Sequence, residues 1–171
     1  MMTKDILQET FNNIEIYDDL VSVGDQRKFL SECNRLGYNV NAWDESPADA
    51  SGASASVSIH SYMHNKLMMI IGNNIMSVEG LQPYDCYVNC FFPNENPNWH
   101  IDNDSDKSRT LIYYANTNDF NEGGTEFLGE NTVMSVLPKA GRIVVFPGNY
   151  KHRATSFRDK KRFTIAFKYK P

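Results

Sequence analysis

The chain has 171 residues, of which 41% are hydrophobic and 12% aromatic, and its formal net charge is −4. This composition excludes a disordered chain and indicates a single globular domain, residues 1–171, with a hydrophobic core of its own. The negative charge argues against a dedicated nucleic-acid-binding protein, because such proteins usually carry a strong excess of basic residues.

Neither a membrane span nor an export signal is predicted. No segment approaches the roughly 18 consecutive apolar residues of a membrane-spanning helix, and the first residues lack the apolar stretch of a signal peptide. The three cysteines (Cys33, Cys86 and Cys90) have no disulfide-framework spacing, so we expect buried free thiols. These features predict a soluble protein of a reducing compartment, the cytoplasm.

Residues 1–80 are predicted to form a scaffold of one strand and two helices. Residues 14–17 alternate like an edge strand. Asp25 is the expected N-cap of the first helix, which should end at Gly37 and bury one apolar side. A second helix is predicted over residues 57–76, where a broad apolar stripe is suited to packing on a sheet.

Two features of this scaffold leave alternatives open. Residues 44–56 are small and polar, which predicts a mobile loop that is either a plain connection or a lid over substrate. His60 and His64 are four residues apart on the second predicted helix, as in some helical metal sites. No third ligand lies nearby in the sequence, so we expect both histidines to be surface or packing residues.

The rest of the chain, residues 82–171, predicts a β-sandwich or barrel. Short β-branched and aromatic runs alternate with turn residues about every 8–12 positions. The N-terminal helices should then brace the outside of one sheet. The runs are residues 84–92, 110–114, 125–128, 132–137, 142–146, 152–155 and 162–169.

Two histidines and an aspartate in this β region are candidate metal ligands. His100 and Asp102 are two residues apart, so both point to the same face if the segment is an extended strand. His152 is the only other histidine of the β region. Two imidazoles and one carboxylate leave about half of an octahedral metal's positions open. By spacing alone, a metal site is the less common arrangement, because an isolated pair such as His100 and Asp102 is more often a hydrogen-bonded surface pair.

The full series of motifs in the β region is more specific. In chain order, the motifs are residues 99–102, 109–116, 122–127, 141–147, His152 and residues 162–165. In this order, they resemble the 2-oxoglutarate- and Fe(II)-dependent dioxygenases, and most closely their prolyl-hydroxylase branch. The resemblance covers about residues 82–171 and implies a mainly β, double-stranded β-helix (jelly-roll) core with the N-terminal helices packed on one sheet.

The resemblance implies roles for four of these residues. His100, Asp102 and His152 would bind Fe(II). Arg162 would pair with the distal carboxylate of 2-oxoglutarate, since a planar guanidinium can meet a carboxylate with two hydrogen bonds. The alternative for Arg162 is a solvated member of the charged cluster at residues 158–162.

Two further residues would assist the co-substrate. Tyr114 stands where the hydroxylase pattern has a tyrosine that hydrogen-bonds the same carboxylate, and Thr164 lies on the face of Arg162. Tyr113 should point to the opposite face and pack. A register shift of one residue would exchange the two tyrosines.

The implied reaction is hydroxylation of a C–H bond of a peptidyl residue such as proline, with O2 as the oxidant. In this reaction 2-oxoglutarate is converted to succinate and CO2, and ascorbate is a possible reductant. The carboxylate of Asp102 favours hydroxylation, because halogenating relatives have lost it. Phe91 or Phe92 replaces a tyrosine that the hydroxylase pattern has before the His-x-Asp motif. This removes a hydroxyl from the expected pocket wall. Candidate substrate contacts are Trp99, Arg109, Arg142 and Arg153.

The expected partner is a peptide, a protein or a small-molecule substrate, with no membrane and no indication of oligomeric state. Two other functions remain open. A nucleic-acid demethylating subgroup has a second arginine six residues after the first, where this chain has Lys168. A non-catalytic jelly-roll module that binds a sugar or another metal would have no need of Arg162.

Overall fold

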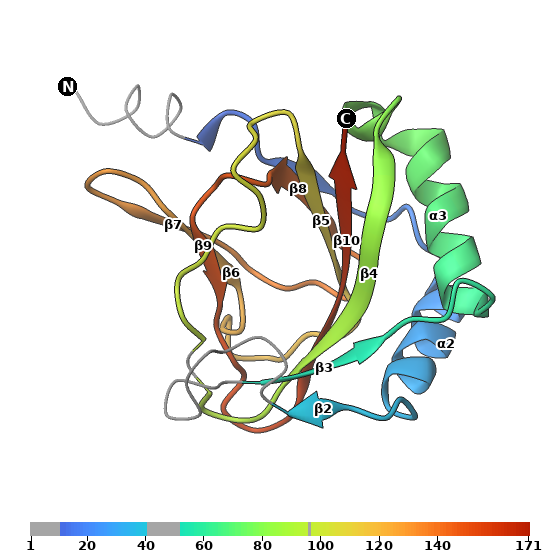
Figure 1. Cartoon of the computed structure of the whole chain (residues 1–171). Coiled ribbons are helices and arrows are strands. Elements are labelled where there is room, and N and C mark those ends of the chain that lie inside the picture. The colour runs from blue at the N-terminus through green and yellow to red at the C-terminus, as the bar shows by residue number, and fades with distance from the viewer. Residues whose placement is uncertain (1–10, 41–51, 96) are drawn as a thin grey trace.

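A computed structural model describes residues 11–40, 52–95 and 97–171. It contains two antiparallel sheets that face one another, with two helices outside the larger sheet (Figure 1). This confirms the mainly β jelly roll. In spatial order, the large sheet consists of β1 (Glu15–Tyr17), β8 (Ile143–Pro147), β5 (Arg109–Tyr114), β10 (Arg162–Lys170), β4 (Gln82–Phe91), β3 (Ala53–Ser56) and β2 (Asn39–Val40). The small sheet consists of β7 (Val133–Val136), β6 (Thr125–Leu128) and β9 (His152–Ala154).

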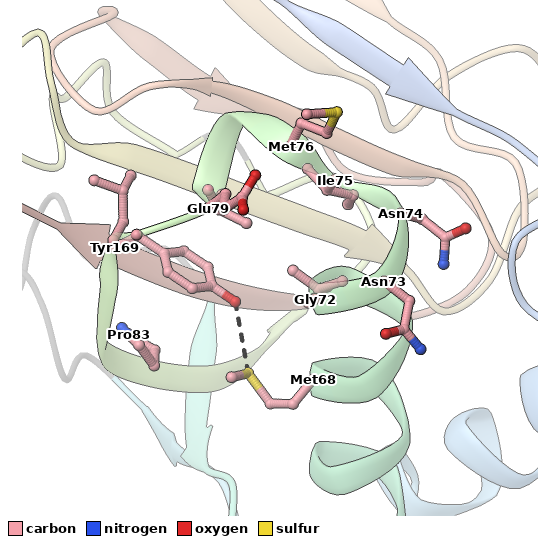
Figure 2. Close-up of a pocket in the computed structure, with 13 residues that line it drawn as sticks. Met68, Gly72, Asn73, Asn74, Ile75, Met76, Glu79, Pro83 and Tyr169 are labelled. Carbon is pink, nitrogen blue, oxygen red and sulfur yellow. Dashed lines mark hydrogen bonds between the residues drawn. The ribbon is translucent and has the colours of Figure 1, made fainter.

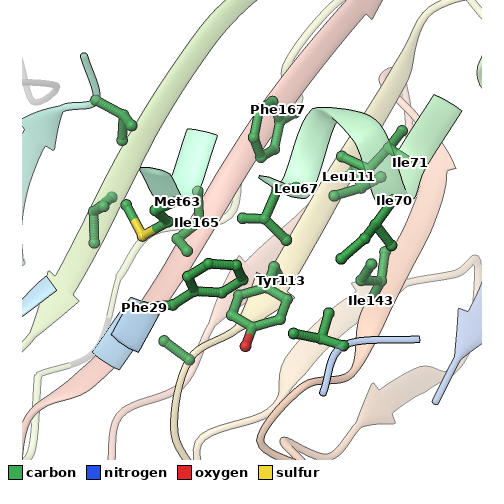
Figure 3. Close-up of a cluster of buried hydrophobic side chains, with 14 of the residues drawn as sticks. Phe29, Met63, Leu67, Ile70, Ile71, Leu111, Tyr113, Ile143, Ile165 and Phe167 are labelled. Atoms are coloured by element: carbon green, nitrogen blue, oxygen red, sulfur yellow. The ribbon is translucent and has the colours of Figure 1, made fainter. Parts of the chain in front are cut away.

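The main hydrophobic core lies between the large sheet and the helices (Figure 3). Helices α2 (Val23–Cys33) and α3 (Tyr62–Asn74) and the 3-10 turn η1 (Met76–Val78) supply one side of it. Leu67 of α3 and Phe167 of β10, for example, are fully buried there. The three cysteines are free thiols, as expected, and none of the described helices is long and apolar enough to cross a membrane.

Both helices differ from the prediction at their ends. Helix α2 is capped by Ser22, whose Oγ accepts a hydrogen bond from the backbone N–H of Asp25. Asp25 is therefore a first-turn residue and not the N-cap, and the helix ends at Cys33, before Gly37. Helix α3 begins after Ser61, which caps the N–H of His64 in the same way. Residues 57–60 lie ahead of this cap and are not helical.

The predicted loop over residues 44–56 is wrong at its end. Residues 44–51 lie outside the described part of the chain, but Ala53–Ser56 form β3 and pair with β4. Ala53 and Ala55 of this strand are buried. The small and polar composition of these residues indicated a loop. They form a strand because their backbone groups find hydrogen-bonding partners on the edge of β4, which does not depend on the side chains.

Successive side chains of β10 point alternately to the helix-side core and to the space between the two sheets. Phe163, Ile165 and Phe167 point into the core on the helix side. Arg162 and Thr164, on the opposite face, line a cavity between the two sheets. A second apolar cluster, which includes Phe11, Ile112, Tyr114, Phe127, Val136, Val144 and Phe146, packs on this face as well. A strand with one apolar and one polar face thus places polar side chains inside the jelly roll.

Candidate metal and co-substrate site

The three candidate metal ligands converge in the structure. One ligand atom from each of His100, Asp102 and His152 can be chosen so that all lie within 4.8 Å of one another. His100 and Asp102 lie in the β4–β5 connection and not on a regular strand, which differs from the expectation. His100 forms only an isolated bridge to His152, with two backbone hydrogen bonds of 2.9 Å. The N–H groups of Asp102 and Asn103 both donate to the carbonyl of Gly148, which fixes this connection against the β8–β9 turn.

Both imidazoles are oriented by backbone carbonyls. Nδ1 of His100 lies 3.2 Å from the carbonyl oxygen of Asn98, and Nδ1 of His152 lies 2.9 Å from that of Tyr150. A carbonyl can only accept, so Nδ1 carries the hydrogen in each ring and Nε2 keeps a lone pair for a metal. Burial lowers the pKa of His152 to about 4, partly opposed by the charge of Asp102, so this ring is neutral at pH 7.

The carboxylate of Asp102 is held from both sides. Thr110 donates to Oδ2 at 2.6 Å, and Nζ of Lys168 lies 3.0 Å from Oδ1. Burial favours the neutral acid, but His152, Lys168 and Thr110 together keep the pKa of Asp102 below its ordinary value. The donor set is therefore two imidazole nitrogens and one anionic oxygen, which suits Fe(II) with open positions for further ligands.

Arg162 lies in the wall of the same cavity and has an unsatisfied donor. Its side chain is fully buried, and Nε donates to the carbonyl of Gly123 at 2.5 Å. Nη2 makes longer contacts of 3.4 Å to the Gly124 carbonyl and Thr125 Oγ1, and Nη1 has no partner. No carboxylate within the described residues pairs with this guanidinium. A buried, unpaired cation is costly, so the site is suited to an anionic ligand such as a carboxylate.

Tyr114 and Thr164 lie on the predicted faces. The two residues pair across β5 and β10, and the ring of Tyr114 lies 5.4 Å from Cζ of Arg162. The Tyr114 hydroxyl donates to Thr125 Oγ1 at 2.7 Å, and Thr164 is buried in the cavity wall. Tyr113 instead packs against Phe29 in the helix-side core, with ring centroids 5.7 Å apart. The predicted strand register is therefore the observed one.

Strand β4 contributes side chains that sequence reasoning missed. Of the two phenylalanines considered, Phe91 faces the cavity, with its ring 5.4 Å from Cζ of Arg162, and Phe92 is exposed. Asn89 and Tyr87 follow at intervals of two and line the same cavity. The alternation of side chains along the strand could have identified them from the sequence. It required knowing that Phe91, and not Phe92, faces the cavity.

The family model of the 2OG-Fe(II) oxygenase superfamily matches residues 86–170, which include all three candidate ligands and Arg162. The chain belongs to this superfamily. Fe(II), 2-oxoglutarate and O2 are therefore the cofactors of this oxygenase, in agreement with the donors described above. A search of curated protein sequences finds no match.

Solved structures confirm the fold of the oxygenase at low sequence identity. HygX from Streptomyces hygroscopicus, with nickel and 2-oxoglutarate bound, has a TM-score of 0.75 and 13% identity, covering 100% of this chain and 88% of that one. A Pseudomonas putida prolyl-4-hydroxylase has a TM-score of 0.71 and 16% identity, covering 95% and 94%. A prolyl hydroxylase from Trichoplax adhaerens, in complex with a hypoxia inducible factor peptide fragment, has a TM-score of 0.69 and 19% identity, covering 96% and 86%.

The four predicted substrate contacts do not line the cavity of the oxygenase. Arg142 forms two hydrogen bonds of 2.9 Å with the carboxylate of Asp18 and ties β8 to the N-terminal segment. Arg109 donates to backbone carbonyls of its own loop. Arg153 lies over the ring of Trp99, and alternation along β9 directs it away from the cavity that His152 and Ala154 line.

Among the described residues, no ligand set of this kind lies on the helix side. His60 is exposed, and the ring of His64 packs 5.8 Å from that of Phe167, which agrees with the expected surface and packing roles. A second cavity, of about 480 Å³, lies where α3 and η1 meet the ends of β4 and β10 (Figure 2). Its wall is mostly apolar, with one hydrogen bond of 3.5 Å from the hydroxyl of Tyr169 to Sδ of Met68.

Proposed function

We propose that this oxygenase hydroxylates a C–H bond of a peptidyl residue such as proline and releases succinate and CO2. The observation that carries the proposal is the metal triad and the unpaired Nη1 of Arg162 in the walls of one cavity between the sheets. When bound, iron, 2-oxoglutarate and O2 together supply the oxidation of the C–H bond.

The side chains of this chain bind and orient these groups. His100, Asp102 and His152 hold the metal through two Nε2 atoms and one carboxylate oxygen. Arg162 takes the distal carboxylate of 2-oxoglutarate through its free Nη1 and fixes the orientation of the co-substrate. The side chain of His100 is 52% exposed, whereas those of Asp102 and His152 are almost fully buried, so the substrate approaches from the side of His100.

The role of Tyr114 is indirect on this proposal. Its hydroxyl is already bonded to Thr125, which in turn contacts Nη2 of Arg162. Tyr114 therefore helps to hold the guanidinium, and Thr164, beside it in the cavity wall, offers a hydroxyl to the co-substrate. The free thiols suit a reducing compartment, so we propose that the enzyme acts in the cytoplasm.

Two kinds of substrate are supported by different observations. The prolyl hydroxylases among the structural neighbours favour a peptidyl substrate, and one of them is in complex with a peptide. The apolar ring of Phe91 in the cavity wall and the similarity to HygX, which has been solved with hygromycin B bound, favour a small molecule. Specificity lies in the residues at the cavity mouth rather than in the fold.

The test measures succinate formed from 2-oxoglutarate with and without Fe(II), in the presence of prolyl peptides, free amino acids or nucleotides. We expect Fe(II)-dependent succinate that rises with prolyl peptides, and a peptide product that has gained one oxygen atom. Succinate stimulated only by a free amino acid or a nucleotide would replace the peptidyl substrate with that class. No Fe(II)-dependent turnover and no 2-oxoglutarate binding would refute the enzymatic function itself.

Substitution of one ligand separates metal binding from folding. His152→Ala should abolish binding of Fe(II) or Ni²⁺, measured by titration calorimetry, while the circular dichroism spectrum keeps its β signature. His60→Ala is the matched control, because His60 is exposed and lies on the helix side. Unchanged metal affinity in His152→Ala would remove this residue from the site.

A further inference from the structure

Lys168 occupies an unusual position beside the candidate metal site. It lies on the cavity face of β10, directly across from Thr110 on β5. Nζ of Lys168 reaches Oδ1 of Asp102 at 3.0 Å while Thr110 holds Oδ2 at 2.6 Å, so one cross-strand pair fixes both oxygens of the carboxylate. The two partners are shielded from water, with side chains that are 15% and 4% exposed for Lys168 and Asp102.

The lysine is the cation that compensates Asp102 when no metal is present. Among the described residues, Lys168 is the one lysine or arginine whose side chain forms an ion pair with the carboxylate of Asp102. Removing one partner of a buried ion pair leaves an uncompensated charge and is strongly destabilising. Lys168 therefore stabilises the metal-free site.

The same charge acts against a bound metal. A divalent ion ligated by Asp102 and the ammonium group of Lys168 share one carboxylate, so the two cations come within a few ångströms of each other. Like charges at such distances repel appreciably even at the effective dielectric of a protein surface. A group that stabilises the metal-free protein more than the metal-bound protein lowers the affinity for the metal by linkage.

We propose that Lys168 is a built-in counter-ion for Asp102, which keeps the carboxylate in its ligand position in the metal-free protein and weakens the binding of divalent metal. The proposal rests on the metal site of the proposed function. Lys168 acts through Asp102 and is a positioning residue. The metal-free site then stays ordered and needs no rearrangement to receive its ion, and the bound ion remains exchangeable.

The test compares three variants on β10. Lys168→Met removes the charge and keeps an unbranched apolar stem, Lys168→Arg keeps the charge, and Lys170→Met is the control at an exposed lysine that lies beside Tyr84. Melting temperatures are measured with a chelator present, and dissociation constants for Ni²⁺ are measured by calorimetry without 2-oxoglutarate. If Lys168→Met does not fold, Lys168→Gln replaces it in the same comparison.

We expect Lys168→Met to melt at a lower temperature without metal and to bind Ni²⁺ about tenfold more tightly than the unsubstituted protein. Lys168→Arg and Lys170→Met should match the unsubstituted protein in both measurements. A purely structural lysine would lower the melting temperature and weaken or leave unchanged the Ni²⁺ affinity, and that result overturns the proposal. An unsubstituted protein that binds no divalent metal refutes the metal site itself, which is a separate failure.

Discussion

Replacing the buried arginine tests whether it serves the co-substrate or the fold. Arg162→Met removes the guanidinium and keeps a long, unbranched side chain in the same space. The hydrogen bond to the Gly123 carbonyl is lost, which costs about 1–3 kcal/mol for a buried acceptor. The Gly124 carbonyl keeps its bond of 2.9 Å from the N–H of Thr155. The substitution also removes the cost of burying an unpaired charge, which offsets the lost hydrogen bond. The free energy of unfolding of the metal-free protein should therefore change by less than about 2 kcal/mol.

The affinity for 2-oxoglutarate should change far more. Truncating one partner of a buried, hydrogen-bonded charge pair costs about 2–5 kcal/mol, which corresponds to about 30-fold to several thousandfold weaker binding. The assay is calorimetric titration of 2-oxoglutarate into Ni²⁺-loaded protein, beside urea unfolding of the metal-free protein. Lys161→Met, at the exposed neighbouring position, should behave as the unsubstituted chain. A variant that unfolds far more easily but binds 2-oxoglutarate normally would show that Arg162 is a structural residue.

Two further substitutions test the elements that support the site. Gly123→Ala should lower the free energy of unfolding, measured in urea, by at least about 2 kcal/mol, because φ is +76° at Gly123 and a Cβ would overlap the ring of Phe157. The control is Gly72→Ala on α3, where a Cβ would enter open space, so this variant should be neutral or stabilising. Equal effects of the two substitutions would contradict this reasoning. Asp18→Asn should lower the free energy of unfolding by about 1 kcal/mol at pH 7, because the hydrogen bond from Arg142 lowers the pKa of Asp18. A carboxyl with a lowered pKa stabilises the fold above its unfolded pKa of about 3.9, so the difference between the two proteins should vanish as the pH falls through the folded pKa, and a difference that persists in acid would refute the ion pair.

Short-range patterns predicted much of the β core. The alternation of β10 correctly placed Arg162 and Thr164 on one face, because a strand must point successive side chains to opposite faces. The same rule placed Tyr113 in the helix-side core and Tyr114 on the other face. Helix ends were less predictable, since Ser22 and Ser61 compete as caps with other polar residues nearby.

The environment of single side chains was hardest to predict. Arg142 looked like a substrate contact because it lies near the ligands in sequence, but it pairs with Asp18, 124 residues away. Composition suggested a loop over residues 53–56, where pairing with β4 makes a strand. Both errors have one cause. A neighbour distant in the sequence supplies the ion pair or the hydrogen bonds, and no local pattern contains it.

The sequence alone determined which residues were candidate ligands, their order along the chain and the faces of the strands, because these depend on residue identity and on the period of two. The roles expected for His100, Asp102, His152 and Arg162 came from the resemblance of the motifs to the dioxygenase family. Only the tertiary structure decided that the His-x-Asp segment forms an isolated bridge rather than a regular strand, and that Lys168 and Thr110 share the carboxylate of Asp102. Those outcomes depend on cross-strand register and on the path of a long connection, which are set by packing of the whole molecule.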